Sequence, residues 1–251
     1  MYRITWRCSS LNLAAVAFAL WLSLVLVLFV PKSAFSQSAT ECVDAASLWL
    51  PSDSASEKFV TKWPKDITFS IISHERDAAA AKLVEAALNS LSRRTGLRIV
   101  EIGQSNDATL PDLLVVVDPN VSNDAPLLRE LALKFFQSRF SLAGRFQIDA
   151  DAWNKKFKSM SPKCGGLDVE INHAKNMSFI AIQEDAAPAC VSIGLGQSLG
   201  MIGVRNYYAA NGEKAPEAVL EEAMRGLYSA EIRIGMKRDE AIEHLKGACK
   251  Q

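Results

Sequence analysis

Apolar and polar positions along the first half of the chain follow strand and helix periods in turn. Alternation with β-branched residues indicates strands, and apolar residues spaced three and four apart indicate helices. The period-two segments are the expected strands 67–72, 97–102 and 113–117. The helical segments are 77–91, 127–140 and 153–160. The third strand is almost wholly apolar, which is typical of a strand covered on both faces.

The second half begins with two short strand patterns and then becomes helical. Strands are expected over 167–171 and 177–182, paired around 173–176, and helices over 188–203, 216–228 and 238–249. The order of elements is thus alternating strands and helices first, and helices alone afterwards. This order favours an α+β layered domain, with a mixed sheet packed on helices and a helical C-terminal part. We expect one domain over 61–251, preceded by an N-terminal extension over 37–60.

The first 36 residues have the layout of an export signal. Arg3 and Arg7 precede an apolar run over 11–30, and Ala34 and Ser36 place small residues before a cut at Gln37. The run is also just long enough to cross a bilayer, so an uncleaved anchor is the alternative. A cleaved signal predicts a periplasmic or secreted protein. A retained anchor predicts an inner-membrane protein that faces the periplasm.

The chain has 251 residues, 49% of them hydrophobic, which excludes a disordered or collagen-like chain. Without the signal, 25 basic residues stand against 28 acidic ones. This slightly negative balance offers no electrostatic basis for binding nucleic acid. Contact with a membrane is expected only if residues 11–30 are retained. A protein of the cell envelope is the candidate partner. The sequence does not specify the partner further.

Four cysteines follow the signal, and an even number in an exported chain predicts two disulfides. Three pairings of these cysteines are possible, and we favour Cys164 with Cys190, and Cys42 with Cys249. Metal ligation and free buried thiols are the two alternatives, since unpaired cysteine is often buried.

The segment 190–203 has the spacing of a zinc-peptidase helix. Such a helix carries two histidines four residues apart, a glutamate after the first, then a glycine turn and a third histidine. These five positions are here Ile193, Gly194, Gln197, Gly200 and Gly203. Only the turning glycine is kept, so the sequence predicts no metal, no catalytic base and no cofactor at this helix.

Three stretches of the chain are similar to a bacterial family of exported proteins of unknown function, whose members resemble distant zincins, the fold of the zinc metallopeptidases. The stretches are Lys62-Trp63, Cys190 with 197–201, and 227–228 through 235–236 with 240–241. Family members carry two glutamates before the glutamine and an Asn-Asp pair after the glycine, where this chain has Ile193-Gly194 and Gly203-Val204. The resemblance implies a zincin-like fold and a catalytically inactive binding or structural module of the cell envelope.

A serine hydrolase is the competing interpretation. Residues 196–200 match the G-x-S-x-G nucleophile turn around Ser198, and Asp239 and His244 follow in the required order. This turn needs a strand before it and further strands after it, whereas the residues after Ser198 are expected to be helical.

Overall fold

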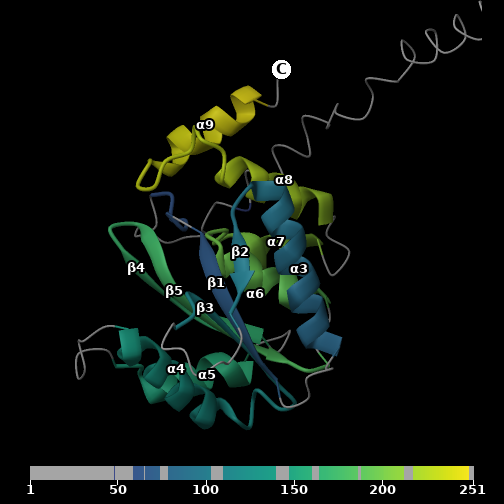
Figure 1. Cartoon of the computed structure of the whole chain (residues 1–251), viewed down its shortest axis with the longest axis vertical. Coiled ribbons are helices and arrows are strands. Elements are labelled where there is room, and N and C mark those ends of the chain that lie inside the picture. The colour runs from purple at the N-terminus through teal and green to yellow at the C-terminus, as the bar shows by residue number, and fades with distance from the viewer. Residues whose placement is uncertain are drawn as a thin grey trace, which may run out of the picture. The chain divides into compact units, whose positions relative to one another are not determined.

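The computed structural model describes residue 48 and residues 59–64, 66–73, 79–102, 110–139, 147–159, 164–185, 188–211 and 217–248 (Figure 1). All of them belong to one compact unit, Ala39–Gln251. The expected signal over 1–36, Cys42, His74 and Cys249 lie outside the described residues. Within the described residues, no helix is long and apolar enough to cross a membrane.

The described chain contains the strands and helices that the pattern predicts, with shifts of a few residues at their ends, and one further helix, Val204–Asn211, that was not predicted. The elements are β1 Ile67–Ser73, α3 Ala79–Thr95, β2 Ile99–Glu101, β3 Leu113–Asp118, α4 Ala125–Arg139, α5 Ala150–Ser159, β4 Cys164–Ile171, β5 Ala174–Gln183, α6 Pro188–Ser198, α7 Val204–Asn211, α8 Glu217–Leu227 and α9 Arg238–Ala248.

The strands form one five-stranded mixed sheet in the order β2-β1-β3-β5-β4. β2, β1, β3 and β5 are parallel, and β4 pairs with β5 as an antiparallel edge strand. The expected mixed sheet and α+β class are therefore confirmed. The expected helical C-terminal part is also present, as α6 to α9.

Helices cover both faces of this sheet (Figure 1). Successive residues of β5 point to opposite sides, so Ile180 and Ile182 join a core with α3, α6, α8 and α9. Phe179 and Ala181 join a second core with α4 and α5. Two covered faces explain the nearly unbroken apolar pattern of β3.

The helix expected over 188–203 ends earlier, at Ser198, and a further helix, α7, begins at Val204, because the chain turns at Gly200. Gly200 has a φ of +109°, a conformation that side chains oppose. A Cβ atom at this position would lie 2.2 Å from the carbonyl oxygen of Thr61. The close approach of a distant segment therefore requires glycine at the end of α6.

Candidate functional site

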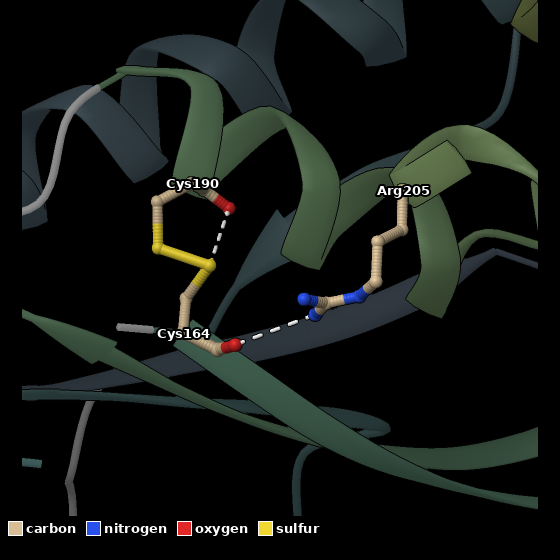
Figure 2. Close-up of a disulfide and its surroundings, with 3 residues drawn as sticks. All are labelled: Cys164, Cys190 and Arg205. Atoms are coloured by element: carbon tan, nitrogen blue, oxygen red, sulfur yellow. Dashed lines mark hydrogen bonds between the residues drawn. A yellow bond between two sulfur atoms is a disulfide. The ribbon is translucent and has the colours of Figure 1, made fainter. Parts of the chain in front are cut away.

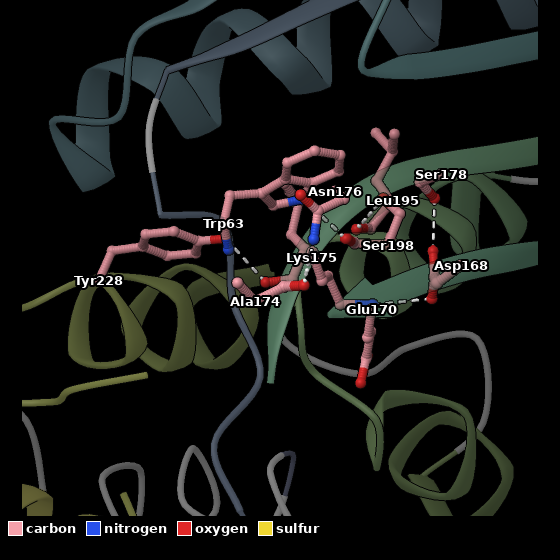
Figure 3. Close-up of polar contacts among 11 residues, drawn as sticks. Trp63, Asp168, Glu170, Ala174, Lys175, Asn176, Ser178, Leu195, Ser198 and Tyr228 are labelled. Atoms are coloured by element: carbon pink, nitrogen blue, oxygen red, sulfur yellow. Dashed lines mark hydrogen bonds and ion pairs between the residues drawn. The ribbon is translucent and has the colours of Figure 1, made fainter. Parts of the chain in front are cut away.

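Trp63, Ser198 and Tyr228, one residue from each of the three stretches that carry the family resemblance, are linked by hydrogen bonds (Figure 3). The indole nitrogen of Trp63 donates a hydrogen bond to the carbonyl of Ser198 at 2.9 Å. The backbone N–H of Trp63 donates to the Tyr228 hydroxyl at 3.3 Å, and that hydroxyl donates to the carbonyl of Leu199 at 2.9 Å. Trp63 and Tyr228 thus satisfy carbonyls at the end of α6, where a helix leaves its last acceptors unpaired.

Lys62 holds the end of α8 in the same way. Its ammonium donates to the carbonyls of Leu227 at 2.9 Å and Ile232 at 2.6 Å, and it lies 5.4 Å from the centre of the Tyr228 ring. Burial lowers the pKa of Lys62 and raises the pKa of the Tyr228 hydroxyl, because burial disfavours the charged form of each group. The contacts described for Lys62 are structural.

The predicted disulfide between Cys164 and Cys190 is present, with 5.8 Å between the two Cα atoms (Figure 2). It joins the first residue of β4 to the first turn of α6. The Arg205 guanidinium of α7 donates to the Cys164 carbonyl at 3.5 Å, and partial burial lowers the pKa of Arg205. The proposed pairing of Cys42 with Cys249 stays a prediction.

A cavity of about 160 Å³ lies between the edge strand β4 and α6, with β5 as its floor. The disulfide ties together the two elements that form its walls. We call it the β4–α6 cavity. Its lining residues are Gly166, Asp168 and Glu170 from β4, Lys175, Ser178 and Ile180 from β5, Gly194, Gln197 and Ser198 from α6, and Ile202 after it.

A β-bulge brings charged side chains together at this cavity. Ser178 and Lys175 are three positions apart on β5, so strict alternation would point them to opposite faces. The register of β4 against β5 shifts between Val169 and Glu170, so that Asp168 pairs with Ser178 and Glu170 pairs with Lys175. The extra residue on β5 puts Lys175 on the same face as Ser178.

Lys175 is almost completely buried, with 1% of its side chain exposed, and its charge is compensated. Its ammonium lies 2.8 Å from Asp168 Oδ2 and 3.4 Å from Glu170 Oε1. Ser178 Oγ donates to the second oxygen of Asp168 at 2.5 Å (Figure 3). A buried ammonium without such partners would be costly, so the carboxylates account for a lysine in an apolar strand.

The structure separates the five positions that the sequence analysis compared with a zinc-peptidase helix. Gly194 and Gln197 line the β4–α6 cavity, whereas Ile193 is buried in the apolar core. Gly200 forms the turn, and the Gly203 backbone N–H donates to the carbonyl of Leu48 at 2.9 Å.

The donor set at this helix does not fit zinc. Structural and catalytic zinc sites use three or four histidine, cysteine or carboxylate ligands. In the described part of the chain, no group of three or more His, Cys, Asp or Glu side chains is placed to hold a metal ion. His173 is exposed in the turn between β4 and β5, and His244 is exposed on α9. Neither histidine lines the β4–α6 cavity.

The geometry of the nucleophile turn is not formed around Ser198. Ser198 ends a helix rather than following a strand, it is 2% exposed, and its hydroxyl donates to the carbonyl of Leu195 at 2.9 Å. His244 lines a different cavity, beside Glu222 and Ser229. The structure therefore does not place Ser198 and His244 in one cavity.

Sequence reasoning missed Asp168, Lys175 and Ser178. The one signal in the sequence was a lysine within the apolar pattern of β5, which a buried strand tolerates only with a partner. The partner could not be found from strand alternation, because the bulge changes which residues share a face.

Comparison of this chain with protein-family models, with curated proteins and with solved structures finds no match. The geometry of the β4–α6 cavity must therefore carry the functional assignment.

Proposed function

We propose that the chain is an exported, zincin-like domain without a metal, and that it binds a ligand in the β4–α6 cavity without catalysing a reaction. The observation that carries the proposal is the composition of this cavity. Gly194 and Gln197 stand on its helical wall at positions where a zinc peptidase has its base and a ligand. An ion pair centred on Lys175 lies at its floor.

The walls of the cavity support a binding role, because several contacts hold β4 and α6 in place. The disulfide joins the β4 wall to the α6 wall, and Trp63 fixes the end of α6. Gly200, the one position of the zinc-helix pattern that is kept, allows the chain to turn against Thr61. Rigid walls lower the entropy that the protein must lose on binding, so they favour recognition.

The serine hydrolase has less support. A working nucleophile needs a base within hydrogen-bond reach, and the Ser198 proton is directed to a backbone carbonyl. A fluorophosphonate probe should leave the purified protein unlabelled, and Ser198→Ala should not change that result. Labelling that is lost in Ser198→Ala would support the hydrolase instead.

The binding role is tested by photo-crosslinking in cells of the source organism. Ile202, which lines the cavity, is replaced by a diazirine analogue of leucine, which is close to isoleucine in size and leaves the cavity open. The matched control carries the same residue at Leu127, an exposed leucine of α4. We expect light-dependent adducts at position 202 that are absent at 127. Equal adducts at both positions, or none at 202, would contradict the cavity as a binding surface.

A further inference from the structure

We infer that the β4–α6 cavity recognises a primary ammonium group carried on a short unbranched alkyl stem. The inference rests on the proposed function, since it gives the ligand class of the same cavity. Three properties of the cavity support it: the charge that its surface presents, the hydrogen-bonding capacity left over in its walls, and its size.

The charge at the cavity surface is negative. The two negative charges of Asp168 and Glu170 exceed the single positive charge of Lys175. The three side chains also differ in how much of their surface is exposed to solvent. The side chains of Asp168 and Glu170 are 27% and 36% exposed, whereas that of Lys175 is 1% exposed. A ligand entering the cavity therefore meets the carboxylates and not the ammonium. An anion would be repelled there, and a cation would be attracted.

Most of the polar atoms of the cavity walls that can still form a hydrogen bond are acceptors. The Ser198 hydroxyl donates its proton to Leu195, so its lone pairs are left to accept a hydrogen bond. Among the described contacts, Glu170 has Lys175 as its single partner, and the side-chain amide of Gln197 has none. An ammonium group has three donors and no acceptor, which matches the acceptor oxygens of Ser198, Glu170 and Gln197.

The cavity is also the right size for one side-chain-like group. Its volume of about 160 Å³ is below the ~300 Å³ at which pockets for drug-sized ligands begin. Ile180 and Ile202 provide apolar walls for an alkyl stem. Glycine is required at position 166, where a Cβ atom would lie 2.8 Å from the carbonyl oxygen of Phe179, so that wall carries no side chain.

The test is a titration of the full exported chain, labelled with ¹⁵N, followed through the backbone amide signals of Gly166 and Gly194. The cationic probes are n-butylammonium and Nα-acetyl-lysine amide, which separate a free amine from a lysine side chain. The controls are n-butanol and butyrate, which have a similar stem without the positive charge. We expect saturable shifts with at least one cation and none with either control.

Two cavity variants and one matched control variant make the titration decisive. Glu170→Gln should weaken binding of the cation at least five-fold, whereas Glu243→Gln on α9, which does not line the cavity, should leave it unchanged. Ile202→Trp fills the cavity while leaving the ion pair intact, and it should abolish binding. This second variant keeps the test valid if Glu170→Gln does not fold.

The outcomes separate this inference from the proposed function. Equal shifts with n-butanol, or no shift with either cation, would overturn the ammonium assignment. If adducts at position 202 persist in that case, the cavity still binds a ligand of another class. If those adducts are also absent, the proposed function fails as well.

Discussion

The indole nitrogen of Trp63 donates a hydrogen bond to the carbonyl oxygen of Ser198, 135 positions further along the chain. Both groups are buried, and the acceptor is the last residue of α6. Tyr228 completes the contact by bonding both Trp63 and Leu199. This small network fixes the end of the helix that forms one wall of the cavity.

Trp63→Phe keeps an aromatic ring and removes the donor. The Ser198 carbonyl would lose its side-chain partner inside the protein, so the free energy of unfolding should fall by about 1–3 kcal/mol. Urea denaturation measures the change. Leu127→Ala, at an exposed position, should stay within about 0.5 kcal/mol of the parent protein, and a Trp63→Phe variant that does the same would contradict the network's role.

Gly200→Ala should be more damaging than Gly96→Ala. Both glycines have positive φ, but only the Cβ atom at 200 would collide with backbone, at 2.2 Å from Thr61 O. At Gly96 nothing lies within 4 Å, so the cost there is the left-handed conformation alone, about 1–2 kcal/mol. We expect a loss of more than about 3 kcal/mol for Gly200→Ala. Equal losses in chemical denaturation would exclude the proposed contact with Thr61.

Removing the disulfide with Cys164→Ser and Cys190→Ser together should lower the free energy of unfolding by about 3 kcal/mol, since the bond closes a loop of 26 residues. Denaturation without reductant measures the loss. Peptide mapping under the same conditions should recover the Cys164–Cys190 peptide from the parent protein. Free thiols at both positions would contradict the assignment.

Stability should fall above pH 10 because of Tyr228. Burial raises the pKa of its hydroxyl in the folded protein, so the unfolded chain ionises first and folding then has to take up a proton. The contribution is constant below the unfolded pKa of about 10 and is lost above it, by up to about 1.4 kcal/mol per pH unit.

The comparison variant is Tyr228→Phe, which has no hydroxyl to ionise. The difference in the free energy of unfolding between the parent and the variant should shrink from pH 9 to pH 11. A difference that stays constant over this interval would show that the Tyr228 hydroxyl is not protected by the fold.

The sequence predicted the fold well where local periodicity decides the structure. The strand of β3 and the helix of α4 follow directly from their apolar spacing. The cysteine count predicted disulfides without deciding their pairing, and the favoured pair, Cys164 with Cys190, is present. Gly200 was identified as a turning glycine, but the end of α6 just before it was missed, because the turn depends on Thr61, a residue distant in sequence.

The candidate site was predicted only in part. Gln197 and Gly194 were identified from the spacing of the zinc helix, and both line the cavity. The ion pair of Lys175 with Asp168 was not predicted, because one extra residue in β5 reverses the face of the sheet to which Lys175 points. Patterns of period two cannot reveal a bulge of this kind.

The central claim is that this helix frames a cavity for binding and does not hold a metal. Elemental analysis of the protein, purified without chelator or added metal, tests it most directly. Less than about 0.1 zinc per chain is the result expected from the donor set around Gln197. One tightly bound zinc per chain would contradict the account.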